Sequence, residues 1–233
     1  MEVLVDVLVV LLAALTGASL QLGTGTLLLL YHEGLGRKVP KRVRRAASGY
    51  IFGVLIFTIL LLATAVLLML LWFGEALNED GLIFLASLCI VMAGIVILFY
   101  YRRGKTTMLW IPNFMAKYFK KRAGKVETGA EGMALGMTAT LGELPFSIIL
   151  ILVAANSLLG LPRAGIIIVI AAYALITIMP ILITKTLIKS GRTLADIQRW
   201  RVKNKMFFRI FTGVMYLILA IFLVAFKVIK GAA

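Results

Sequence analysis

The stretch MTATLGELPFSIILILVAANSLLGLP, residues 137–162, is almost wholly apolar and holds a single carboxylate, Glu143. Its length fits a membrane-spanning helix, since about 20 apolar residues are needed to cross a hydrocarbon layer roughly 30 Å thick. An ionised carboxylate inside that layer costs at least a few kcal/mol, so such residues usually face a partner or a water-filled cavity. The stretch therefore predicts a membrane span that contains a candidate functional acid.

The rest of the chain has the same apolar character. Of its 233 residues, 62% are hydrophobic and the mean hydropathy is +1.04, whereas soluble domains are roughly 45–50% apolar. Glu2 and Asp6 stand where a signal peptide would carry basic residues, so we interpret the first span as retained. The sequence predicts an all-α polytopic membrane protein with six transmembrane helices, at about 4–30, 48–72, 82–101, 132–157, 164–188 and 209–227.

Basic residues gather in alternate loops. Of the 25 Lys and Arg residues, six fall in 37–45, eight in 102–125 and eight in 185–209, whereas the loops between these hold only Arg163. The positive-inside rule then predicts a plasma-membrane protein with these three loops in the cytoplasm and both termini outside. Such loops attract anionic lipids. Their strict alternation argues against nucleic-acid binding as the reason for the net charge of +15.

The sequence lacks the residues that several kinds of catalytic and metal sites require. One cysteine, Cys89, cannot form an intramolecular disulfide or a dithiol relay, and one histidine, His32, cannot form a His-rich metal site. The sequence has no nucleophile–base pair, Gly-rich phosphate loop or metal-ligand cluster. We therefore expect neither an enzyme nor a bound cofactor.

Two segments of the chain align at one constant offset. Matching TGASLQLGTGTLLLLY at 16–31 with TATLGELPFSIILILV at 138–153 pairs Gln21 with Glu143, and a Thr-rich start leads into an aliphatic run in both. We interpret the match as an internal duplication. Because each unit would hold three spans, an odd number, the second would insert upside down relative to the first. This inverted repeat is the plan of many secondary transporters.

The duplication predicts three parts of the chain. A first three-span repeat covers 1–101, a basic amphipathic cytoplasmic linker covers 102–131, and a second three-span repeat covers 132–233. Aromatic and Met side chains alternate with Lys at 106–124, a pattern typical of a segment that lies in the membrane interface. The same pattern would also suit docking of a cytosolic partner.

Transporters of this plan bind substrates near the bilayer midplane, where helices are interrupted. The predicted helix breaks are at Gly23, Gly25, Gly142, Pro145 and Pro180. The predicted substrate- or ion-binding residues are Glu143, Gln21, Thr16, Thr138 and Thr140. Glu143 would bind a cation or carry a proton. The alternative is a neutral structural acid that caps the helix where it restarts before the proline.

The segment LGTGTLLLLYHEGLGRKVPKRVRRAASGYIFGVLI, residues 22–56, resembles the first hairpin of the lysine exporter superfamily. GELPF at 142–146 and LPRAGIIIVIAAYALITIMP at 161–180 are similar to the matching part of its second half. The resemblance implies a duplicated six-span fold, in a superfamily that includes amino-acid and metal-ion exporters and CcdA-type thiol–disulfide carriers. Two motifs differ. Residues 23–25 read Gly-Thr-Gly where the amino-acid exporters have Pro-Gly-Pro, and the paired cysteines of the thiol carriers are absent.

These observations together predict a secondary-active transporter that exports a small solute or ion. The chain carries no ATP-binding motif, so an ion gradient or another subunit would supply the energy. The alternative is a non-transporting membrane scaffold or assembly subunit that docks a cytosolic partner through the basic loops, because one fold serves many functions. The substrate, the coupling ion and the formation of a homo-oligomer stay open.

Overall fold

The structure, a computed structural model, describes residues 2–20, 22–33, 41–99, 118–119 and 121–229. No strand occurs among these residues, and the regular structure there is helical. Most of the interfacial segment predicted at 106–124 lies outside the described residues. The elements are α1 (Glu2–Ser19), α2 (Leu22–Glu33), α3 (Lys41–Phe73), α4 (Glu79–Phe99), α6 (Gly129–Leu159), α7 (Arg163–Lys189), α8 (Leu194–Lys203), α9 (Lys205–Leu223) and the π-helical turn η1 (Val224–Ile229).

Six segments are long and apolar enough to cross a membrane, which confirms the predicted number of candidate spans. They are Val3–Tyr31, Lys41–Phe73, Glu79–Leu98, Gly129–Leu159, Arg163–Lys189 and Lys205–Val228. Several begin earlier than predicted, because their first turns carry polar residues that the apolar count leaves out. Basic residues at the start of the second segment are an example, since they belong to the helix as well as to the loop.

The first and fourth spans differ in continuity. The first is divided, since α1 ends at Ser19 and α2 begins at Leu22. Gly23 and Gly25 lie inside α2, so the breaks predicted at these two residues are wrong, and α2 begins just before them. The predicted breaks at Gly142, Pro145 and Pro180 are wrong, because α6 and α7 run through them as continuous helices. A proline removes one backbone donor, and neighbouring helices and Thr hydroxyls can compensate for that loss in a membrane bundle.

Helices α3 and α6 pack in close contact through glycines. An added Cβ at Gly49, Gly53, Gly132 or Gly136 would lie 2.0–2.2 Å from a backbone carbonyl oxygen of the facing helix. The two helices run in the same direction, since Gly49 faces Gly129 and Gly53 faces Met133 further along. Small residues spaced four apart allow this approach of two backbones, as in other membrane helix pairs. The contact fixes the position of α6, which carries Glu143.

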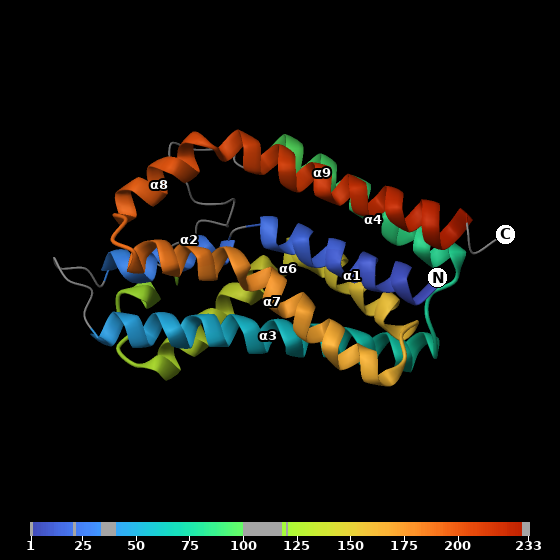
Figure 1. The fold of residues 1–233 in the computed structure, drawn as a ribbon, viewed down its shortest axis with the longest axis horizontal. Coiled ribbons are helices and arrows are strands. Elements are labelled where there is room, and N and C mark those ends of the chain that lie inside the picture. Colours follow the sequence, from blue (N-terminus) through green and yellow to red (C-terminus); the bar gives the residue numbers. More distant parts are fainter. Residues whose placement is uncertain (1, 21, 34–40, 100–117, 120, 230–233) are drawn as a thin grey trace.

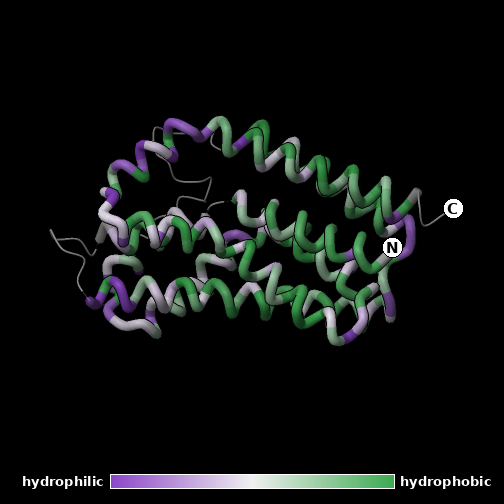
Figure 2. The backbone as a smooth tube through the Cα atoms, in the orientation of Figure 1, coloured by the Kyte–Doolittle hydropathy of each residue, from purple (hydrophilic) through white to green (hydrophobic). Residues whose placement is uncertain are grey.

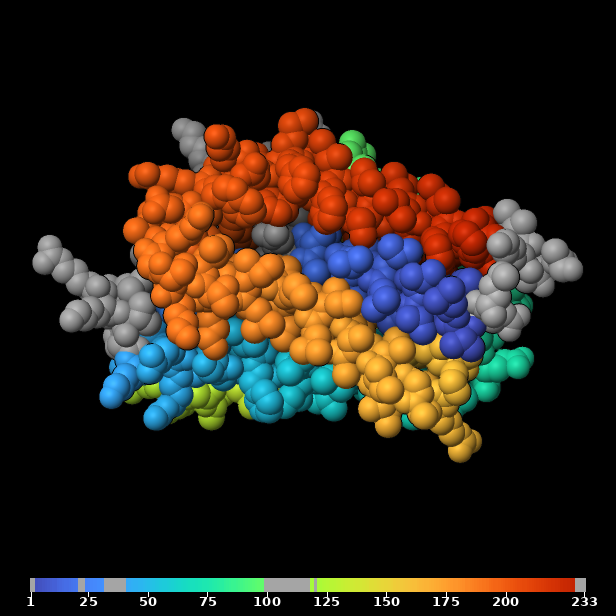
Figure 3. All heavy atoms as spheres, in the orientation of Figure 1, coloured from blue at the N-terminus to red at the C-terminus, as the bar shows by residue number. Residues whose placement is uncertain are grey.

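The helices form a bundle in which α1 is central. It packs against α6 and α7 on one side and against α9 on the other, while α4 packs against α9. In the space-filling view, α1 is seen between α7 and α9 (Figure 3). Figure 1 places the basic start of α3 and helix α8 at one end of the bundle, and the α3–α4 connection at the other. Hydrophilic segments gather at these two ends, with apolar helices between them (Figure 2).

Candidate functional site

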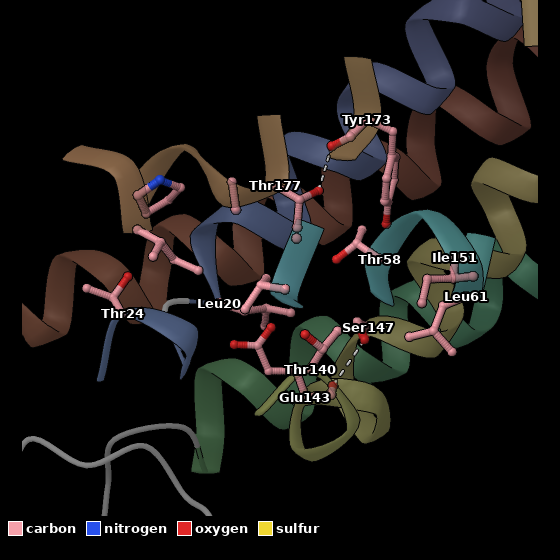
Figure 4. A pocket seen from close by; sticks show the side chains of 15 residues that line it. Leu20, Thr24, Thr58, Leu61, Thr140, Glu143, Ser147, Ile151, Tyr173 and Thr177 are labelled. Atoms are coloured by element: carbon pink, nitrogen blue, oxygen red, sulfur yellow. Dashed lines mark hydrogen bonds between the residues drawn. The ribbon is translucent and has the colours of Figure 1, made fainter. Parts of the chain in front are cut away.

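A small cavity lies beside Glu143, at the division between α1 and α2. Its volume is about 30 Å³, enough for at least one water molecule. Figure 4 shows the side chains around it, which come from α1, α2, α3, α6 and α7. The lining residues are Gly17, Ala18, Leu20, Thr24, Val54, Thr58, Leu61, Thr140, Glu143, Ser147, Ile151, Tyr173, Thr177, Pro180 and Ile181. The acid of the fourth span therefore faces the interruption of the first.

Three of the hydroxyl groups around the cavity already donate their protons to backbone carbonyls. Thr140 donates to Gly136 O at 3.1 Å, and Ser147 donates to Glu143 O at 3.2 Å. Thr177 donates to Tyr173 O at 2.8 Å. A hydroxyl that donates in this way offers only its lone pairs to a ligand. Together with the carboxylate, these oxygens place several acceptors in an otherwise apolar lining, which suits a proton, a water molecule or a cation.

Two buried tyrosines, Tyr50 of α3 and Tyr173 of α7, interact electrostatically with Glu143. Tyr50 is fully buried and Tyr173 is 2% exposed. The phenol of Tyr50 forms a side-chain hydrogen bond with Thr26 of α2. In Figure 4 the Tyr173 hydroxyl points toward Thr58. Tyr173 thus lines the cavity together with Glu143, while Tyr50 connects α3 to α2 through its bond with Thr26.

Tyr173 is not among the binding residues predicted from the sequence, yet it lines the cavity. The spacing of residues along the helix could have indicated its place in the cavity. Tyr173, Thr177 and Pro180 are four and three residues apart, which puts them on one face of a helix. Thr140, Glu143 and Ser147 have the equivalent spacing on α6. Two polar faces of this kind within apolar spans indicate a shared polar site, and the structure brings them together.

The predicted binding residues divide into three groups. Glu143 and Thr140 line the cavity together. Thr16 and Thr138 lie outside the lining: Thr16 is buried and donates to Leu12 O at 2.7 Å, while Thr138 donates to Ala134 O at 2.9 Å. Their hydroxyls satisfy carbonyls within their own helices rather than facing the cavity. Gln21 lies outside the described residues.

A second acid lies inside the bundle, and it is not among the binding residues predicted from the sequence. Asp6 of α1 is 2% exposed and forms an ion pair with Lys227 of η1. Gly160 makes room for it, since an added Cβ there would lie 2.6 Å from Asp6 Oδ2. The pair joins the first span to the last. No sequence pattern linked these two residues, which stand at opposite ends of the chain.

Comparison with protein-family models, with curated proteins and with solved structures found no match to this chain. The resemblance to the lysine exporter superfamily therefore remains an expectation from its motifs. Among the described residues, no group of three His, Cys, Asp or Glu side chains lies close enough together to hold a metal ion.

Proposed function

We propose that this protein is a secondary transporter of a small solute or ion, in which Glu143 carries a proton or binds the coupling cation. One observation carries the proposal: the acid in the fourth span lines a small cavity with several hydroxyl groups, between the end of α1 and the start of α2. Broken helices near the midplane are where transporters of the inverted-repeat plan hold substrates and ions.

The packing of the helices supports the inverted repeat that this proposal includes. In a duplicated fold, α1, α3 and α4 of the first half would correspond to α6, α7 and α9 of the second half. The α3–α6 contact would then have α1–α7 as its equivalent, and the α1–α9 contact would have α4–α6. All four contacts are present. The contacts α1–α6, α3–α7 and α4–α9 map onto themselves under the same exchange, and these are present too. A two-fold relation between the halves would produce this set of pairs.

In the proposed cycle, Glu143 alternates between a neutral and an ionised state. A cavity of about 30 Å³ is too small for most organic solutes, so we assign it to the coupling proton or cation. The neighbouring hydroxyl oxygens would accept hydrogen bonds from a hydronium ion or a hydrated cation while the carboxylate supplies the charge.

Flux through proteoliposomes tests the proposal. Vesicles with an internal pH dye would carry a pH gradient and receive amino acids, organic acids or metal cations in turn. We expect at least one class of solute to dissipate the gradient faster than in protein-free vesicles. The transporter proposal is wrong if none of these solutes dissipates the pH gradient and if no ion gradient drives the uptake of any of these solutes. That result would favour the scaffold or assembly subunit.

A further inference from the structure

A large groove lies between α3 and α4, at the end of the bundle that carries their connection. Helix α3 packs mainly against α6, while α4 packs mainly against α9, so these two neighbours in the sequence stand apart. Figure 1 shows them separated and joined by the connection at one end. The groove has a volume of about 990 Å³, at the upper end of the usual range for small-molecule sites. We call it the α3–α4 groove.

The walls of the α3–α4 groove are mostly apolar. Along α3 the lining extends from Leu61 to Phe73, a length of about 18 Å at the helical rise per residue. Helix α6 contacts both α3 and α4 and also contributes to the lining. The lining residues are Leu61, Thr64, Ala65, Leu68, Met69, Trp72, Phe73, Glu75, Ala76, Leu77, Asn78, Asp80, Gly81, Phe84, Leu85, Leu144, Ile148, Ile151 and Leu152. A bulky or elongated apolar body fits such a space better than a small ion does.

The connection at the end of the groove is held in place by specific bonds. The backbone N–H of Leu77 donates to Asn156 Oδ1 of α6 at 2.7 Å, and Asn156 is 2% exposed. The backbone N–H of Gly81 donates to Asn78 Oδ1 at 3.1 Å. The chain turns at Gly74 with φ +74°, a conformation that favours glycine. These features fix the position of the connection relative to α6.

The charges at this end of the groove favour a cation. Glu75 and Asp80 line it, and no basic side chain is among its described lining residues. Neither acid forms an ion pair within the part of the chain that the structure describes. Trp72, Phe73 and Phe84 also line the groove, and the faces of aromatic rings attract cations. A positively charged group therefore complements this end, and a negatively charged group would be repelled.

We infer that the α3–α4 groove binds an amphipathic organic cation. Its apolar body lies along the aliphatic walls of α3 and α6, and its charge lies beside Glu75 and Asp80. A plain acyl chain would make no use of the two carboxylates, and a hydrated metal cation would make no use of the apolar walls. The inference concerns binding alone and holds whether or not the protein transports.

Fluorescence of Trp72 can report on this groove directly. Trp110 and Trp200 are the other tryptophans, and replacing both with Phe leaves Trp72 as the sole emitter. The protein would be placed in phosphatidylcholine nanodiscs and titrated with tetraphenylphosphonium or tetraphenylborate, which have the same shape and opposite charge. We expect a saturable change in Trp72 emission with the phosphonium cation and no saturable change with the borate anion.

Variants of the acidic residues test the charge. Replacing both lining acids, by Glu75→Gln together with Asp80→Asn, should weaken phosphonium binding by about fivefold, since each exposed charge contributes modestly. Glu79→Gln removes an equal charge next to Asp80, from an exposed residue outside the lining. This control should leave binding close to that of the wild type.

Variants on α3 test the apolar body separately from the charge. Thr64 is an exposed residue of the lining, so Thr64→Phe would fill part of the groove. It should weaken phosphonium binding by about tenfold, because overfilling a site is costly. Leu67→Phe introduces the same side chain at an exposed position of α3 outside the lining. This variant should bind the cation as the wild type does.

Each other outcome would overturn the inference. Equal losses in Glu79→Gln and in the double variant would show an effect of overall surface charge. Saturable binding of tetraphenylborate as tight as that of tetraphenylphosphonium would remove the charge preference. A lipid chain would be the occupant if phosphatidylcholine with brominated chains quenches Trp72 and the phosphonium cation does not relieve this quenching. The absence of any saturable response to the cation would also overturn the inference.

Discussion

The two acids inside the bundle are held in opposite ways. Asp6 is almost completely buried and paired with Lys227, and Gly160 leaves space for its carboxylate. Glu143 borders a cavity whose described lining includes hydroxyl groups and no basic side chain. A carboxylate with a fixed counter-ion has little freedom to exchange its proton, whereas our proposal requires the carboxylate beside the water-sized cavity to do so. The comparison therefore separates an acid that stabilises the bundle from the acid that the proposal assigns to coupling.

The largest effect on stability should come from Asp6. Asp6→Ala leaves Lys227 as an uncompensated charge, and breaking a buried ion pair costs about 3–5 kcal/mol. Glu143→Gln keeps the shape of the side chain and should change the free energy of unfolding by under about 1 kcal/mol. Thermal unfolding of both variants in the same detergent compares them. Equal destabilisation would remove the distinction between the two acids.

The next effect should come from the α3–α6 contact, which holds Glu143 against the divided span. Gly132→Ala would place a Cβ 2.2 Å from Ala46 O and force the helices apart. Overpacking of this kind costs about 1–3 kcal/mol. Gly94→Ala in α4 is the matched control, because nothing lies within 4 Å of its added Cβ. Unfolding measurements that give the same loss for both variants would contradict the close crossing.

A smaller effect is expected where α9 is tied to α6 beside Pro145. The Tyr216 hydroxyl donates to Phe146 O at 2.5 Å, and both groups are buried. Tyr216→Phe should cost about 1 kcal/mol, the usual net contribution of such a bond. Tyr118→Phe, at a residue 44% exposed, should change stability by less than about 0.5 kcal/mol. Thermal unfolding checks both, and a neutral Tyr216→Phe would show that this bond does not hold the cavity wall.

The six spans were predictable because apolar length is a local property of the sequence. Glu143 was predictable for the same reason, since it is an acid within an apolar run. Tyr173, which lines the same cavity, was missed because tyrosines are common at membrane interfaces, and only the face that it shares with Thr177 distinguishes it. The Asp6–Lys227 pair could not be predicted, since it depends on how the first and last spans pack. The continuity of α6 through Pro145 likewise depends on neighbouring helices rather than on the proline itself.

The central claim is that Glu143 couples transport to a proton or cation. The most direct measurement is the pH dependence of flux in proteoliposomes for the wild type, Glu143→Gln and Glu131→Gln, with thermal stability matched. Glu131 is an exposed acid on the same helix and controls for the loss of one charge. We predict that Glu143→Gln loses gradient-driven flux and its pH dependence, while Glu131→Gln behaves as the wild type does. Unchanged flux and unchanged pH dependence in Glu143→Gln would contradict the account and leave Glu143 as a structural acid.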